Sequence, residues 1–167
     1  MAILKHISVK NRFYSSAVEY LTCQFDEYTN KPVLDEKGRI QERENYLIVG
    51  VNCDVDSFGA ECIEVNRLYG KNNSVKDVKA HHYIISFEPN DPITIEQALE
   101  FGKQWLSVFA PGHQAVVAVH PDGHNGSQNM HVHMVINSVR KYAGKQSRWH
   151  EKPCEWKLGC KHKSTGK

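Results

Sequence analysis

Two late stretches of the chain alternate between apolar and polar side chains, as β-strands do. Residues 115–120 read AVVAVH and residues 131–137 read HVHMVIN. Because alternate residues of a strand share a face, one side of both stretches is small or apolar: Ala115, Val117, Val119, Val132, Met134 and Ile136. The other side carries His120, His131, His133 and Asn137. The pattern therefore predicts a sheet with one apolar face and one face that bears histidines.

The remaining pattern predicts three further strands and three helices. Apolar runs bounded by turn residues predict strands at residues 2–8, 46–53 and 81–87. Apolar residues at helical spacing predict helices over residues 16–23, 58–69 and 95–109. Residues 26–45 are polar and are expected to form an exposed excursion with a hairpin around residues 35–38.

Each predicted helix begins with residues typical of a helix cap. Ser16 with Glu19, and Thr94 with Gln97, fit the capping box, in which two side chains bond the free N–H groups of the first turn. The middle helix is preceded by side-chain oxygens that could cap it, from Asp54, Asp56 and Ser57. Gly70 and the Pro111-Gly112 pair are expected to end the second and third helices.

The order of these elements indicates the fold class. Strand, helix, strand, helix, strand, helix, strand, strand predicts an α/β (α+β) sandwich with a mostly antiparallel central sheet. We expect the helices to pack on one face of the sheet and the active site to lie on the other. One main domain is expected over residues 1–140. Residues 141–167 would form a basic C-terminal extension, the start of a truncated region.

Composition excludes several classes of protein. With 167 residues the chain can bury a core without disulfide bridges, and five cysteines, an odd number, argue against a secreted disulfide scaffold. No run of eighteen apolar residues and no signal-peptide pattern is present, which predicts a soluble, cytoplasmic protein that does not enter a membrane.

The net charge of +2 conceals an uneven distribution. Residues 139–167 contain nine Lys or Arg side chains and two Glu, a net of +7, so the rest of the chain carries −5. A basic tail on a mildly acidic body predicts an anionic partner, nucleic acid before membrane. A solvated, flexible tail is the alternative interpretation.

The histidines of the two late strands form a candidate metal site. If the strands pair with His120 opposite His131, the Cβ atoms lie about 5 Å apart and His133 shares their face. Three imidazoles on one face suit Mn²⁺, Zn²⁺, Co²⁺ or Ni²⁺ better than Mg²⁺. His124 competes as the third ligand, and Asp122 is better interpreted as a residue that orients a ligand ring. Ordinary, hydrogen-bonded histidines remain the alternative.

The basic tail contains a weaker metal candidate. Cys154, Cys160 and His162 have a spacing that fits no standard zinc pattern and provide only three ligands. Ordinary residues without a metal are the favoured interpretation.

The motifs together resemble those of a known superfamily. A His-hydrophobic-His strand (residues 131–133), an upstream histidine in a His-x-Asp setting (His120, Asp122) and Asn137 are similar to the HUH endonucleases. Tyr20 followed by an apolar residue in an early helix, and a strand that ends at Ser86, are similar to the conjugative relaxases or mobilisation nickases of the MobA/VirD-like, single-tyrosine type. The resemblance covers residues 1–140.

The resemblance implies an α+β enzyme that nicks and rejoins one DNA strand at an origin of transfer (oriT). Tyr20 would attack the phosphodiester and form a 5′-phosphotyrosyl intermediate, with Asp122 or His82 as the base. A divalent metal, first Mn²⁺ or Mg²⁺, would be bound by His120, His131 and His133. The implied partners are single-stranded or hairpin oriT DNA, a type IV coupling protein and accessory DNA-binding proteins.

The resemblance also leads us to expect DNA contacts from Ser86, Asn137, Arg12, Lys76 and Arg140. Tyr14 and Tyr28 are rivals of Tyr20 on helix and loop pattern alone. A rolling-circle replication initiator or a single-strand transposase would use a later tyrosine, and only Tyr142 follows the histidine strand. The sequence is also compatible with a non-catalytic metal- or DNA-binding module, and with a metal-dependent hydrolase that activates water.

Overall fold

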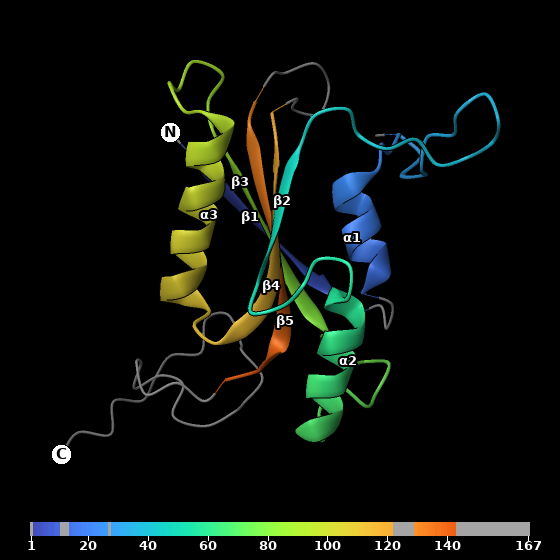
Figure 1. Ribbon diagram of the computed structural model, residues 1–167, viewed down its shortest axis with the longest axis vertical. Helices are drawn as coiled ribbons and strands as arrows, with labels where there is room; N and C mark the ends of the chain where they lie inside the picture. The colour runs from blue at the N-terminus through green and yellow to red at the C-terminus, as the bar shows by residue number, and fades with distance from the viewer. Residues whose placement is uncertain (1, 11–13, 27, 122–128, 143–167) are drawn as a thin grey trace.

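The computed structural model describes residues 2–10, 14–26, 28–121 and 129–142 (Figure 1). The elements are β1 (Ile3–Val9), α1 (Ser15–Thr22), β2 (Leu47–Val51), α2 (Phe58–Leu68), β3 (Ala80–Ser86), α3 (Ile95–Phe109), β4 (His113–His120) and β5 (His131–Arg140). The predicted order of strands and helices is therefore confirmed. Most of the expected extension, including Cys154, Cys160 and His162, lies outside the described residues. Within the described part of the chain, no helix is long and apolar enough to cross a membrane.

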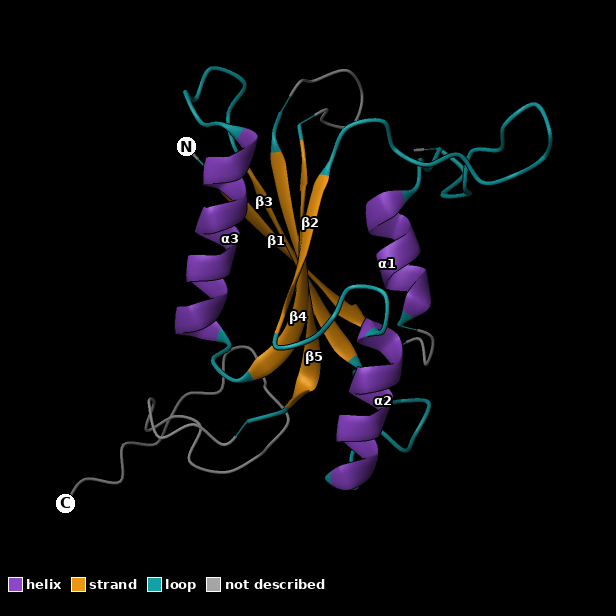
Figure 2. Cartoon of the chain, viewed as in Figure 1, coloured by secondary structure: helices purple, strands orange, loops and turns teal. Residues whose placement is uncertain are grey.

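The strands form one antiparallel sheet in the order β1-β3-β5-β4-β2 (Figure 2). The predicted register of the two late strands is confirmed, because His120 on β4 pairs with His131 on β5. On the other side of β5, Ser86 at the end of β3 pairs with His131. The three central strands therefore bring Ser86, His120 and His131 to the same end of the sheet.

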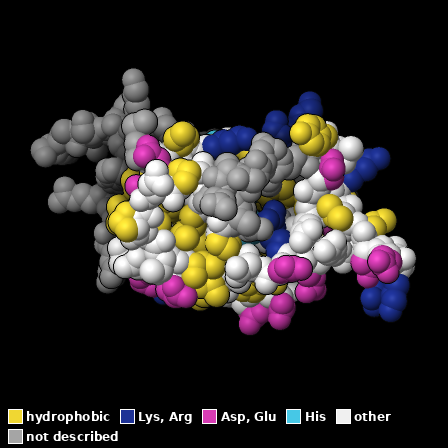
Figure 3. Space-filling model, turned by 90° about the horizontal axis from the view of Figure 1, so that it is seen from above, with side chains coloured by type: hydrophobic (Ala, Val, Ile, Leu, Met, Phe, Trp, Pro, Cys, Tyr) yellow, Lys and Arg dark blue, Asp and Glu magenta, His cyan; other side chains and the backbone are white. Residues whose placement is uncertain are grey.

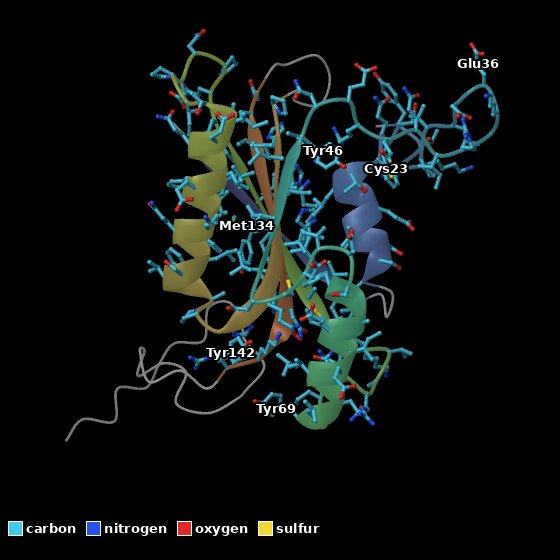
Figure 4. All side chains as sticks on the ribbon, viewed as in Figure 1. Cys23, Glu36, Tyr46, Tyr69, Met134 and Tyr142 are labelled. Carbon is cyan, nitrogen blue, oxygen red and sulfur yellow. The ribbon has the colours of Figure 1, made fainter. Side chains whose placement is uncertain are left out.

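One face of the sheet packs against α3. Its core contains the alternating residues predicted for the apolar face: Ala115, Val117, Val119, Val132, Met134 and Ile136. Figure 4 shows Met134 on the side of the sheet that faces α3. Gly102 lies where α3 comes closest to the sheet, since a Cβ atom there would be 2.8 Å from Val117 and from Val132. The close contact with α3 explains why this face carries small and β-branched side chains.

The second face is covered by α1 and α2, which lie across the sheet from α3 (Figure 1). This corrects the expectation that all helices would pack on one face, although the α+β class with a mostly antiparallel sheet is confirmed. The physical reason is that the face with the histidines is not polar throughout. Val116, Ala118 and Val135 point to it and pack beneath Leu21 and Phe58 of the two helices. Among the described residues, the histidines of this face lie toward the end marked by His120 and His131.

The predicted capping box of α3 is confirmed, because the Thr94 side chain accepts from the Gln97 N–H and the Gln97 side chain accepts from the Thr94 N–H. The capping box at Ser16 is wrong. α1 begins one residue earlier, at Ser15, and its N-cap residue Tyr14 makes no side-chain cap bond. Ser57 is the N-cap residue of α2 but its hydroxyl donates to Glu61 Oε1 (2.8 Å) instead of capping the helix.

Residues 26–45, here called the arm, leave the body between α1 and β2 as predicted (Figure 4, where Glu36 marks the tip). The expected turn is present, since Asp35 Oδ1 accepts from the N–H groups of Lys37 (2.9 Å) and Arg39 (2.8 Å). Single bridges pair Phe25 with Pro32 and Leu34 with Ile40. The arm therefore folds back on itself and returns its later residues to the end of α1.

Candidate active site

Four histidines gather on the face of the sheet that α1 covers. The ring centroids of His120 and His133 are 4.4 Å apart, and those of His131 and His133 are 6.2 Å apart. His82 on β3 joins them, with its centroid 5.3 Å from that of His133. The structure thus brings together the three predicted metal ligands and one predicted catalytic residue.

A hydrogen bond holds each of the three predicted ligand rings. His120 Nε2 donates to the backbone carbonyl of Leu21 (2.7 Å), so the proton is on Nε2 and the lone pair is on Nδ1. His131 Nδ1 lies 2.7 Å from Ser86 Oγ, and His133 Nδ1 lies 3.1 Å from His82 Nε2. Partners of this kind orient the metal-binding histidines of proteins and leave the other ring nitrogen for the ion.

His133 is the most confined member of the group. Its side chain is 1% exposed, and within the described residues its Nε2 atom is buried without a hydrogen-bond partner. Burial, followed by the charges of His120, His82, His131 and Arg43, holds the pKa of His133 well below its usual range. Burial also lowers the pKa of His82 to about 4, with further contributions from Lys5 and His6. Both rings are therefore neutral at pH 7, which is the form of imidazole that binds metals.

One observation favours a divalent metal here: the Nε2 atom of His133 is buried and has no hydrogen-bond partner among the described residues. Family resemblance implies such an ion as well. Among the described residues, however, no group of three or more His, Cys, Asp or Glu side chains has the arrangement of a formed metal site. The metal site therefore stays a prediction.

Tyr20 lies next to the histidines. Its ring centroid is 5.9 Å from that of His82 and 6.1 Å from that of His133, both in edge-to-face geometry. Phe25, just before the arm, packs against the Tyr20 ring with the centroids 5.3 Å apart. The position of α1 therefore places the Tyr20 phenol beside the histidine group.

The rival tyrosines have different surroundings. The Tyr14 ring is buried, and its hydroxyl lies 3.1 Å from the Lys79 carbonyl and accepts from Asn66 Nδ2 at 2.7 Å. Tyr28 is 93% exposed on the arm. The Tyr14 hydroxyl is thus engaged in the interior and Tyr28 faces solvent, which distinguishes both of them from Tyr20.

Two of the residues predicted to contact DNA are buried. Asn137 is fully buried, where its Oδ1 accepts from the Tyr14 hydroxyl (3.2 Å) and its Nδ2 donates to Gln114 Oε1 (3.2 Å). Arg140 is 1% exposed. Both side chains lie in the interior of the protein, and their contact with DNA stays a prediction. Ser86 is half-buried and bonded to His131, and Lys76 is exposed in the loop before β3.

Three further predicted residues, Asp122, His124 and Arg12, lie outside the described residues. In contrast, sequence reasoning missed two cations that flank the histidines. Lys5, on β1, pairs with Ile84 and influences the pKa of His82, and Arg43, at the return of the arm, influences that of His133. Neither stands in a recognisable motif, so only the pairing of β1 with β3 and the return of the arm reveal them.

The end of the molecule at which β4 stops and β5 starts is seen from above in Figure 3. Hydrophobic side chains gather in the left half of this view, most Lys and Arg side chains lie in the right half, and Asp and Glu side chains lie in both. A family model described as "Relaxase: MobA/VirD2-like, nuclease domain" matches residues 28–160 of the chain.

The chain belongs to this relaxase family. The family acts in DNA nicking, conjugation and mobilisation, which confirms the resemblance that the motifs indicated. The match begins after α1, so Tyr20 lies outside the matched residues while the four histidines lie within them.

Two relatives illustrate the similarity to relaxase-family proteins. Protein rlx of Staphylococcus aureus is 37% identical over 97 residues, which cover 58% of this chain and 28% of that protein. The group II intron-interrupted relaxase LtrB of Lactococcus lactis subsp. cremoris (strain MG1363) is 40% identical over 99 residues, 59% of this chain and 15% of that protein. The chain therefore matches less than a third of the length of either relative.

Proposed function

We propose that this relaxase-family chain nicks and rejoins one DNA strand at an origin of transfer, and so initiates conjugative transfer of a plasmid or integrative element. The observation that carries the proposal is the contact of the Tyr20 ring with His82 and His133. A phenol beside a group of neutral imidazoles combines a nucleophile with a site for the phosphate.

The proposed reaction is an in-line displacement at phosphorus. The Tyr20 oxygen forms a bond to phosphorus as its proton passes to a base, and the bond from phosphorus to the 3′ oxygen of the preceding nucleotide breaks. That 3′ oxygen takes up a proton and leaves as a hydroxyl, while the 5′ phosphate stays on Tyr20. The adduct is itself a phosphodiester, so the 3′ hydroxyl can later attack its phosphorus, release Tyr20 and restore the strand.

A divalent metal, in this proposal, would be held by His120 Nδ1, His131 Nε2 and His133 Nε2. The assignment is supported by the hydrogen bonds that occupy the other nitrogen of each ring. When bound, the ion would neutralise charge on the non-bridging phosphate oxygens. Mn²⁺ suits an imidazole set better than Mg²⁺, which prefers oxygen, and Zn²⁺, Co²⁺ and Ni²⁺ are chemically compatible.

His82 is better suited to orient His133 than to take the phenol proton. If His133 uses Nε2 as a ligand, its Nδ1 carries a proton and donates to His82 Nε2 (3.1 Å). That bond occupies the basic nitrogen of His82, and a pKa of about 4 makes His82 a weak base. We therefore assign His82 a positioning role and retain Asp122 as the proposed base.

The alternative enzymes of the superfamily, the rolling-circle initiators and single-strand transposases, would need Tyr142 as the nucleophile. Tyr142 follows the far end of β5, which starts at His131 and runs to Arg140 (Figure 4). A strand of that length spans about 30 Å. That separation from the histidines favours Tyr20, and hence the relaxase.

The proposed substrate is single-stranded or hairpin oriT DNA, and a type IV coupling protein and accessory DNA-binding proteins are the proposed partners of the whole protein. The test is incubation of the protein with end-labelled single-stranded oriT DNA and Mn²⁺, followed by a denaturing protein gel. A labelled covalent adduct is expected. Cut DNA without an adduct would indicate a hydrolase that activates water, and unchanged DNA would indicate a non-catalytic module.

A further inference from the structure

Arg43 lies between the end of α1 and the end of β4. Its backbone N–H donates to the carbonyl of Thr22 (2.9 Å), and its neighbour Glu42 pairs with Cys23. A few residues later β2 begins with Leu47, which pairs with Val119, the residue before His120. The folded arm thus anchors the Arg43 backbone beside the histidine group.

The Arg43 guanidinium lies within electrostatic range of that group. Its Nε atom is buried and, within the described residues, has no hydrogen-bond partner. Its positive charge is close enough to His133 to be one of the influences on that ring. A buried N–H donor without an acceptor is rare in native proteins and calls for an explanation, such as a ligand.

Arg43 Nε and His133 Nε2 are therefore two unpartnered, buried atoms in one site, within the part of the chain that the structure describes. A cation would satisfy the lone pair of a ligating imidazole, and an anion would satisfy the guanidinium. A phosphate group that approaches a metal supplies both, since its oxygens bind the ion and accept from Arg. The planar guanidinium also matches the geometry of phosphate oxygens.

We propose that Arg43 binds the scissile phosphate of the single-stranded DNA and stabilises the charge that shifts onto its non-bridging oxygens during attack by Tyr20. This inference rests on the proposed function and adds a phosphate-binding residue to it. The arm would then contribute to the reaction, because its folded return holds the Arg43 guanidinium at the site.

The first test measures DNA binding, in the Tyr20→Phe background so that the strand stays intact. Arg43→Gln is compared with Arg39→Gln, which removes the same charge from the same arm. Arg39 is 70% exposed and pairs with Asp35 (3.1 Å) away from the histidines. The slope of log K against log salt should decrease by about 0.7 for Arg43→Gln, the amount expected for one single-strand phosphate contact, and should be unchanged for Arg39→Gln.

The second test measures the rate of adduct formation. Arg43→Gln should slow it by about 100-fold, as removal of one donor to a developing charge does, whereas Arg39→Gln should leave it unchanged. Arg43→Lys keeps the charge without the planar guanidinium, so its rate of adduct formation should lie between those of Arg43→Gln and Arg39→Gln. A methylphosphonate at the scissile position removes one charged oxygen. It should therefore slow adduct formation by the wild type much more than it slows adduct formation by Arg43→Gln.

The outcomes separate this inference from the proposed function. An adduct with the wild type, together with equal salt slopes and rates for Arg43→Gln and Arg39→Gln, would overturn the role of Arg43 alone. If the wild type forms no adduct, the proposed function fails and the salt slopes decide whether Arg43 contacts DNA. Thermal unfolding shows whether each variant is folded. If Arg43→Gln is unfolded, Arg43→Lys is compared with Arg39→Gln in its place.

Discussion

His120, the last residue of β4, donates a hydrogen bond from Nε2 to the backbone carbonyl of Leu21 (2.7 Å). Leu21 directly follows Tyr20, so a single bond connects a candidate metal ligand with the helix that carries the candidate nucleophile. The other end of α1 is attached to the sheet through the Tyr14 hydroxyl. The position of Tyr20 relative to the histidines is therefore set at both ends of α1.

We predict that His133→Ala abolishes specific Mn²⁺ binding. Removal of a direct ligand should weaken binding by more than about 100-fold, beyond the usual effect of losing an outer partner. Isothermal titration calorimetry with Mn²⁺ measures this directly. His6→Ala is the matched control, because the His6 ring bonds that of His81 (3.0 Å) and reaches the four-histidine group only through its charge, which contributes to the pKa of His82. Full-strength Mn²⁺ binding by His133→Ala would refute the ligand assignment.

Ser86→Ala should weaken the binding of Mn²⁺ without removing any of the proposed ligands. The Ser86 hydroxyl lies 2.7 Å from His131 Nδ1 and orients that ring. Loss of such a partner typically lowers metal affinity by about 10–100-fold. The same calorimetric titration measures the change, and the protein should unfold at nearly the wild-type temperature. An unchanged affinity would mean that Ser86 does not support a ligand.

Tyr14→Phe should destabilise the protein without preventing adduct formation. The lost hydroxyl lies 3.1 Å from the Lys79 carbonyl and accepts from Asn66 Nδ2, so buried polar groups lose a partner. The expected decrease in the free energy of unfolding is about 1–3 kcal/mol, measured by urea denaturation. Tyr28→Phe, at a 93% exposed position, serves as the control and should change nothing. Loss of the adduct in folded Tyr14→Phe would instead favour Tyr14 as the nucleophile.

The stability of the protein should fall in acid partly because of Glu61. Hydrogen bonds from the Asp54 N–H and the Ser57 hydroxyl lower the pKa of Glu61 from 4.5 to about 2, and Lys141 contributes further. A depressed carboxyl pKa stabilises the fold above the unfolded value, and this contribution is lost as the pH decreases from 4.5 to 2.

The matching variant is Glu61→Gln. It should lower the free energy of unfolding at pH 7 by about 1–2 kcal/mol, reduced from the full linkage value because the side chain is 29% exposed. The difference from the wild type should shrink below pH 4.5, which urea denaturation at several pH values can follow. A difference that stays constant down to pH 2 would contradict the assignment, and exposed Glu64→Gln is the control.

Much of the fold follows from local pattern. The alternation in β4 and β5 predicted both their pairing and the face of each histidine, because a strand has a period of two residues and a slip by one residue would bury His120 under α3. Thr94 with Gln97 predicted the start of α3 for a similar reason, since a capping box depends on neighbours in the chain alone.

Other features depend on contacts between distant segments. Apolar Val116, Ala118 and Val135 share the face of the histidines, and their cover by α1 and α2 was not evident from the order of elements. Asn137 was expected to contact DNA because of the family resemblance, but its side chain bonds Tyr14 and Gln114 in the interior. Arg43 reaches the site only through the folded return of the arm, so no local signal could identify it.

The most direct test of Tyr20 as the nucleophile is to identify the residue to which the DNA becomes covalently attached. Wild-type protein is incubated with single-stranded oriT DNA and Mn²⁺, digested with nuclease and protease, and analysed by mass spectrometry, beside Tyr20→Phe. We predict a nucleotide linked through phosphate to the peptide that contains Tyr20, and no adduct for Tyr20→Phe, which should still bind the DNA. An adduct of undiminished yield in Tyr20→Phe, or attachment at another residue of the wild type, would contradict it.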